Sequence, residues 1–124
     1  QRLARRLCTS CREQYSATAT ELEEFCRYLG RQEVDRLTDS GVLKLWHAPG
    51  CAKCDNTGYR GRVALHELLI NNDTIREAIQ RQSGTAEIRE FSISGGMTTL
   101  LQDGVVKCIE GLTDLKQVLA VCSR

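Results

Sequence analysis

The motif CAKCDNTGYRGR, residues 51–62, begins with a Cys-x-x-Cys pair formed by Cys51 and Cys54. A matching pair, Cys8 and Cys11, lies close to the start of the chain. Two residues between the cysteines allow a tight turn to direct both sulfurs at one point, so two such turns complete a tetrahedron of thiolates. Zn²⁺ prefers this ligand set in structural sites, and the sequence therefore predicts one structural zinc ion held by these four cysteines.

The long spacer between the two pairs does not exclude this site. Thirty-nine residues separate Cys11 from Cys51, more than in small zinc fingers. The cost of closing a loop grows only logarithmically with its length, to roughly 3 kcal/mol here, whereas zinc binding to a structural site supplies on the order of 10–16 kcal/mol. Four thiolates on Zn²⁺ leave a formal charge of −2, which nearby basic residues could offset. These residues are Arg5, Arg6, Arg12 and Lys53.

Three other interpretations of the pairs stay open at this point: two disulfides, two redox dithiols, or free buried thiols. The chain has seven cysteines, and an odd count fits a disulfide framework poorly. A redox dithiol usually begins a helix in a βαβ unit, and that pattern is missing. His47, four residues before Cys51, is the main substitute ligand. We expect the three single cysteines to be small buried hydrophobic residues: Cys26, Cys108 and Cys122.

The composition is that of one globular domain. The chain has 124 residues, of which 41% are hydrophobic and only 5% aromatic, so its core must consist of Leu, Ile and Val. The net charge of +1 argues against a dedicated nucleic-acid-binding protein. No segment approaches the roughly 20 apolar residues of a membrane span. Because the chain starts at Gln1 without an initiator Met or a signal peptide, we interpret it as a piece of a longer protein.

Local patterns predict a mainly helical α+β chain with a small β element. Residues 1–7 are expected to form the last turns of a helix, since Leu3 and Leu7 lie one turn apart. A helix over residues 22–29 would end at Gly30 and begin at a capping box, Thr18 with Glu21 or Thr20 with Glu23. A second short helix follows with Val34 and Leu37 and is closed by Gly41. Strands are expected at residues 43–47 and 63–70.

The C-terminal half is predicted to be helical. Asn72 or Asp73 caps a segment whose Ile75, Ala78 and Ile79 face inward. Further helices are expected at residues 85–93, ended by Gly95-Gly96, at residues 97–109, stopped by Gly111, and at residues 115–122, capped by Thr113.

Taken together, these motifs resemble the C-terminal part of the GspE/PilB-type secretion ATPases, which drive type II secretion and type IV pilus assembly. QRLARRLC at residues 1–8 is similar to the QRL-x-R-x-LC entry of the family's tetracysteine motif, and residues 50–62 are similar to its GCxxCxxTGYRGR stretch. Residues 66–69, 96–104 and 111–115 resemble the family's YELL, GMRTLRQDG and GxTTLEEV segments. The sequence departs from these patterns at His66, Thr98 and Leu101.

The resemblance implies a tetracysteine zinc module at residues 1–62, with a variable helical insertion at about residues 16–45, and a C-terminal helical subdomain at residues 63–124. The two parts are expected to form one compact unit. The parent would be a hexameric ATPase on the cytoplasmic side of the inner membrane that couples ATP hydrolysis to protein secretion or pilin polymerisation. Its partners would be neighbouring ATPase subunits and an inner-membrane platform protein.

This chain is expected to be a non-catalytic structural and docking module. A phosphate-binding loop of the form Gly-x4-Gly-Lys-Ser/Thr is absent from the sequence. By resemblance, that loop lies before Gln1, so ATP and Mg²⁺ would bind only in the parent.

Two other function classes compete with this interpretation. A zinc-ribbon module that binds nucleic acid, or a chaperone-type module like the DnaJ zinc domain, would show more cysteine repeats, aromatic platforms or a basic stripe. A thiol oxidoreductase would need an exposed cysteine of low pKa.

Overall fold

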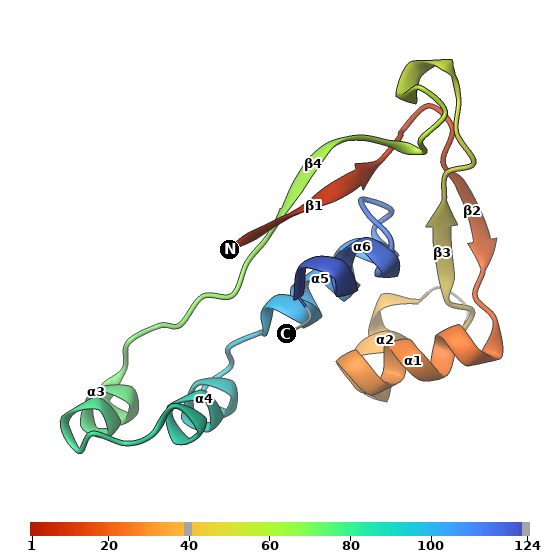
Figure 1. The fold of residues 1–124 in the computed structure, drawn as a ribbon. Coiled ribbons are helices and arrows are strands. Elements are labelled where there is room, and N and C mark those ends of the chain that lie inside the picture. Colours follow the sequence, from red (N-terminus) through yellow and green to blue (C-terminus); the bar gives the residue numbers. More distant parts are fainter. Residues whose placement is uncertain (39–40, 123–124) are drawn as a thin grey trace.

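The computed structural model describes residues 1–38 and 41–122, so residues 39–40 of the expected insertion and residues 123–124 lie outside it. Figure 1 shows two short β-ribbons, each of two strands, with helices beneath them and a helical pair at one end. In chain order the elements are β1 (Arg2–Leu7), β2 (Glu13–Ser16), α1 (Ala19–Leu29), α2 (Arg31–Leu37), β3 (Lys44–His47), the 3₁₀ turn η1 (Ala52–Cys54), β4 (Tyr59–Leu65), α3 (Asp73–Gln80), α4 (Thr85–Ser94), α5 (Leu100–Ile109) and α6 (Leu115–Cys122). The predicted α+β class is confirmed.

The first ribbon pairs β1 with β4. The strands are antiparallel, from Arg2 opposite Leu65 to Leu7 opposite Tyr59, with an irregularity just before Leu7. The prediction of a helix at residues 1–7 is therefore wrong. Leu3 is 51% exposed whereas Leu7 is buried, so the two leucines do not share the buried face that the helical pattern assumed. Pairing with a strand more than fifty residues away overrides the local pattern.

The second ribbon pairs β2 with β3, from Glu13 opposite His47 to Ser16 opposite Lys44. The predicted strand at residues 43–47 is confirmed, but the sequence patterns did not predict β2. Both predicted helices between these strands are present as α1 and α2, although α2 ends at Leu37 rather than near Gly41. Thr18 is the cap of α1, because its Oγ1 accepts from the Glu21 N–H and the Glu21 carboxylate accepts from the Thr18 N–H.

The main core lies where the two ribbons meet the helices. Its buried side chains come from α1, α2, β1, β4, α5 and α6 and from the segment around β3. They are almost entirely aliphatic or cysteine, with one aromatic ring: Ala4, Phe25, Val34, Leu43, Leu45, Leu65, Val105, Cys108 and Val118. Six of the nine are leucine or valine, as the low aromatic content led us to expect, whereas Ala4, Phe25 and Cys108 are not of the expected types.

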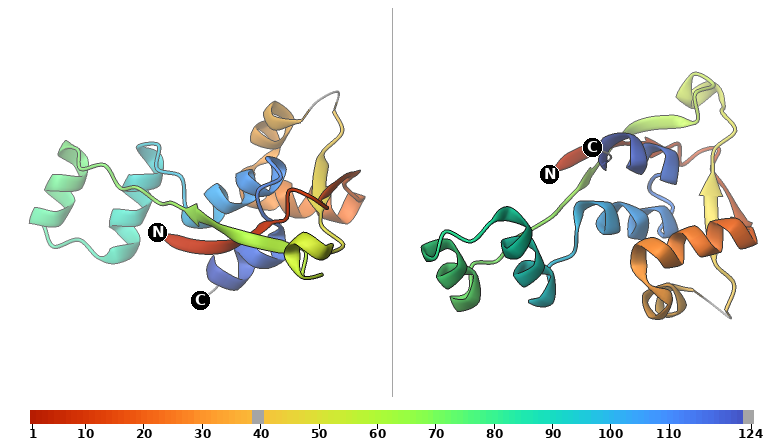
Figure 2. Two further views of the ribbon diagram at one scale, coloured as in Figure 1. Left: turned by 90° about the horizontal axis from the view of Figure 1, so that it is seen from above. Right: turned by 60° about the horizontal axis from the view of Figure 1, so that its bottom comes forward.

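The helices α3 and α4 form a pair that stands apart from the rest of the chain on two extended segments (Figures 1 and 2). Asn72 caps α3 by accepting from the Ile75 N–H, as predicted. Ile75 and Ala78 are buried, but Ile79 is 54% exposed, so its predicted inward orientation is wrong. The predicted strand at residues 63–70 is correct only as far as Leu65, where β4 ends.

The last helix, α6, has the predicted bounds, and α5 differs from its prediction only at its start. α5 begins at Leu100 after a Thr99 cap, so Met97 precedes the helix. The predicted cap of α6 is wrong: the Asp114 carboxylate accepts from the Gln117 N–H, and the Thr113 hydroxyl donates instead to the Arg5 carbonyl. Across residues 1–38 and 41–122, the helices are all too short or too polar to cross a membrane.

Candidate metal centre

Two turns bring the cysteine pairs together. The first follows β1, where the Cys8 N–H donates to the Gly58 carbonyl and the Arg12 N–H donates to the Cys8 carbonyl. The second surrounds η1, where the Cys51 carbonyl accepts from the N–H groups of Cys54 and Asn56. The hydrogen bond between Cys8 and Gly58 joins the two turns directly.

Left-handed backbone closes the second turn. Asp55 and Asn56 have φ values of 54° and 60°, a region that Asp and Asn enter more readily than most residues. Gly58 has a φ of 82°, and its missing side chain lets the turn pass against the Ala48 carbonyl, where a Cβ atom would overlap with the oxygen. The path of the turn therefore requires glycine at position 58 and favours Asp and Asn at positions 55 and 56.

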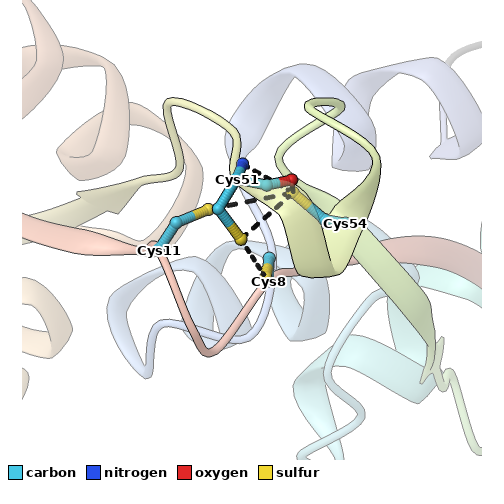
Figure 3. Close-up of side chains that lie close together, drawn as sticks. All are labelled: Cys8, Cys11, Cys51 and Cys54. Carbon is cyan, nitrogen blue, oxygen red and sulfur yellow. Dashed lines mark hydrogen bonds between the residues drawn. The ribbon is translucent and has the colours of Figure 1, made fainter.

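The four predicted ligands form one cluster, with their side chains pointing toward one another (Figure 3). The sulfur–sulfur distance is 3.8 Å between Cys8 and Cys51, 3.8 Å between Cys51 and Cys54, and 3.9 Å between Cys11 and Cys54. All four Sγ atoms lie within 4.8 Å of one another. The four cysteines are placed to bind a metal ion.

Three of the six sulfur–sulfur distances match the edges of a tetrahedral metal site. Four sulfurs at about 2.3 Å from one ion lie about 3.8 Å apart along the edges of the tetrahedron. A disulfide requires a sulfur–sulfur distance of about 2.05 Å, and all seven cysteines are free. The chemistry of the cluster is therefore that of four soft ligands converging on one position.

The site is buried on one side and accessible on the other. Cys8 and Cys54 are only 1% and 4% exposed, whereas Cys11 and Cys51 are half-buried. A metal ion could enter from the side of Cys11 and Cys51, while the other two ligands are fixed by the surrounding backbone.

Backbone N–H groups favour the thiolate form of two of the cysteines. Burial acts to raise the pKa of Cys54, but hydrogen bonds from the N–H groups of Cys51 and Gly58 outweigh it and lower the pKa to about 6. The pKa of Cys8 is likewise lowered, since N–H groups of its own turn oppose the effect of burial. Burial and the neighbouring sulfurs raise the pKa of Cys11 to about 12.

The other residues singled out from the sequence lie elsewhere. His47 is outside the cluster, with its Nε2 3.5 Å from a Glu13 carboxylate oxygen. Arg12 donates to the Gly111 carbonyl and stacks on Trp46, and Arg5 stacks on Tyr59, so both arginines are engaged away from the sulfurs. Sequence reasoning missed the hydrogen bonds that the N–H groups of Cys51 and Gly58 donate to the Cys54 sulfur. The glycine at position 58 of the motif was the one sequence feature that could have indicated them.

The three single cysteines are not part of the cluster. Cys108 is buried in the main core. Its pKa is raised mainly by this burial and to a smaller extent by the negative charge of Asp114. Cys26 and Cys122 are half-buried and pack against the same core. The prediction that all three are buried is therefore correct for Cys108, whereas Cys26 and Cys122 are only partly buried.

The fold and the cluster agree with what is found among known proteins. The family described as "Type II/IV secretion system protein" matches residues 1–120. The chain belongs to this family. The match to the type II/IV secretion family also covers residues 16–45, for which the motifs alone showed no resemblance.

Individual relatives support the same assignment. The type IV pilus assembly ATPase PilB of Thermus thermophilus is 40% identical over 120 residues, which cover 97% of this chain and 13% of the relative. The type II secretion system protein E of Pectobacterium carotovorum is 36% identical over 122 residues, covering 98% of this chain and 22% of the relative. The type II secretion system ATPase E of Vibrio cholerae is 36% identical over 124 residues, with the same two coverages. The chain thus spans between 13% and 22% of the length of these relatives.

Two glycine variants test how tightly the second turn is built. Gly58→Ala places a methyl group against the Ala48 carbonyl and disturbs the N–H that faces Cys54, so we expect weaker zinc binding and a lower melting temperature. Gly61→Ala is the matched control, because Gly61 has a similar φ of 80° but open space around it. The control should lose only about 1–2 kcal/mol of stability from the strained φ and keep the zinc affinity, measured by competition with a chromophoric chelator. Equal loss of affinity in both variants would contradict this account.

Proposed function

We propose that Cys8, Cys11, Cys51 and Cys54 bind one structural zinc ion, and that the chain is a non-catalytic structural and docking module of a secretion or pilus-assembly ATPase. The observation that carries the proposal is the convergence of the four sulfurs to within 4.8 Å of one another, with three pairs at 3.8–3.9 Å, in a chain of the type II/IV secretion family.

Zinc is favoured by the ligand set. Four sulfur ligands in a tetrahedron suit Zn²⁺ or an iron–sulfur centre. Structural zinc is typically one ion with four protein ligands and no open coordination position, and it stabilises a fold without taking part in chemistry. The pKa values of Cys8 and Cys54 are lowered, which favours the thiolate form of these two ligands, whereas the pKa of Cys11 is raised. The zinc would tie the two turns together and leave no open position for a substrate.

The parent role follows from the relatives. Two of those described above are named as ATPases, of type IV pilus assembly and of type II secretion. The parent of this chain would be a hexameric ATPase on the cytoplasmic side of the inner membrane, coupling ATP hydrolysis to protein secretion or pilin polymerisation. This module would contact neighbouring subunits and an inner-membrane platform protein, while ATP and Mg²⁺ bind in the part before Gln1.

The division of the chain into two parts is also a proposal. Residues 1–62 would form the tetracysteine module, including a variable helical insertion at about residues 16–45, and residues 63–124 the helical subdomain. The boundary lies within β4, whose partner is β1, and α6 packs on β1. These contacts support a single compact unit rather than two independent parts.

Serine substitutions separate a ligand from a packing cysteine. Cys51→Ser removes one of four sulfurs, and we expect loss of the tetrathiolate site and a large drop in melting temperature. Cys26→Ser places a hydroxyl in a half-buried position and should cost only about 1–3 kcal/mol. Cobalt substitution provides the readout: the wild type and Cys26→Ser should bind about one ion per chain with four-sulfur charge-transfer bands. Similar melts and similar spectra for both variants would refute the assignment of Cys51 as a ligand.

The absence of catalysis is tested with ATP itself. Phosphoryl transfer needs a phosphate cradle, a Mg²⁺ site and a residue that orients water, and we expect the purified chain neither to hydrolyse ATP nor to bind it in a calorimetric titration. The coding sequence before Gln1 should contain a Gly-x4-Gly-Lys-Ser/Thr motif. Magnesium-dependent turnover that scales with chain concentration, or an upstream sequence without that motif, would contradict the proposed role.

A further inference from the structure

We propose that the metal site controls the position of α6 through the turn that joins α5 to α6. This turn consists of residues 111–114, and we call it the α5–α6 turn. The inference rests on the proposed metal site and adds a conformational consequence: binding or loss of the ion is transmitted to the last helix of the chain.

The first half of the turn is held by the residues that flank the first cysteine pair. Leu7, directly before Cys8, donates its N–H to the Leu112 carbonyl at 2.9 Å. Arg12, directly after Cys11, donates from its guanidinium to the Gly111 carbonyl at 2.6 Å. The two anchors therefore stand immediately on either side of the Cys-x-x-Cys turn.

The second half is held by β1 and β4 close to the same site. The Thr113 hydroxyl donates to the Arg5 carbonyl at 2.8 Å, and the Tyr59 hydroxyl donates to the Asp114 carboxylate at 2.5 Å. Tyr59 follows Gly58, whose N–H faces the Cys54 sulfur. Each of the four consecutive residues of the turn is thus hydrogen-bonded to a residue that leads into or out of the cysteine cluster.

The fit between the turn and Arg12 is close. The guanidinium carbon of Arg12 lies 4.5 Å from the centre of the Trp46 ring. A Cβ atom on Gly111 would lie 2.8 Å from Arg12 Nη1 and 2.9 Å from Trp46 Nε1, and Gly111 has a φ of 83°. Glycine is therefore needed both for the backbone conformation and for the approach of the arginine.

These contacts make α6 dependent on the cysteine turns. A helix of eight residues is too short to be stable by itself in water. Thr113 is fully buried, so its hydroxyl would be left without a partner if the Arg5 strand moved away. When the ion is removed, the four thiols no longer share a fixed centre, the two cysteine turns loosen, and the anchors of the α5–α6 turn lose their positions.

The α3–α4 pair supplies an internal reference. Its buried residues, Ile75, Ala78 and Ser92, are not part of the main core, and it lies at the far end of the molecule from the cysteine turns (Figures 1 and 2). If removal of the ion destabilises α6 through the α5–α6 turn, the stability of the α3–α4 pair should not change. General unfolding would destabilise both α6 and the α3–α4 pair.

Amide hydrogen exchange with and without zinc measures the coupling directly. We expect exchange of the α6 amides to become about tenfold faster when a chelator removes the ion, because several hydrogen bonds are weakened together. Exchange in α3 and α4 should stay within about twofold. Zinc content is measured in the same samples, so absence of bound zinc overturns the proposed metal site itself. Bound zinc with equal α6 exchange in both forms overturns the coupling and leaves the metal site standing.

Two variants break the connection while the ion stays bound. Arg12→Met removes the donor to Gly111 but keeps an apolar stem, and Thr113→Val removes the hydroxyl but keeps the shape. Both should retain the four-sulfur cobalt spectrum and show about tenfold faster α6 exchange in the metal-bound state. Arg60→Met, at an exposed position on β4, is the control and should behave as the wild type. Wild-type α6 exchange in both Arg12→Met and Thr113→Val would overturn the proposal.

Discussion

The meeting of four sulfur atoms from two distant turns is the constraint on which this structure depends. The first cysteine turn connects β1 to β2 and the second connects β3 to β4, whereas the hydrogen-bonded ribbons pair β1 with β4 and β2 with β3. The cysteine cluster therefore lies at the junction of the two ribbons, where β1 and β3 end and β2 and β4 begin. A ribbon of two strands is marginally stable by itself, and a metal ion at this junction would fix the ends of both at once.

The hydrophobic core secures the same ribbons from the other side. Side chains from α1, α2, α5 and α6 pack on β1, β4 and the segment around β3. The hydrogen bonds of residues 111–114 then connect this helical layer to the cysteine turns. Core packing and hydrogen bonds thus both link the last helix, α6, to the strands that lead into the cysteine turns.

The four residues of the cysteine cluster could be predicted from the sequence, because each Cys-x-x-Cys pair is a short local pattern. The Thr-Gly-Tyr sequence that follows the second pair marks its turn. Helices with clear caps, such as the one that begins at Thr18, were predictable for the same reason. β1 was not, because its leucines imitate a helical pattern and only pairing with β4 makes it a strand. Thr113 was misjudged as a cap because its hydroxyl is used by Arg5, a long-range contact that local sequence does not reveal.

X-ray absorption at the zinc edge of the purified protein tests the central claim most directly, because it reports the ligands of the bound ion itself. The proposed zinc site predicts a single shell of four sulfurs at about 2.3 Å, in keeping with the three sulfur–sulfur distances of 3.8–3.9 Å. A shell that contains nitrogen or oxygen, or zinc bound with fewer than four sulfurs, would contradict the account.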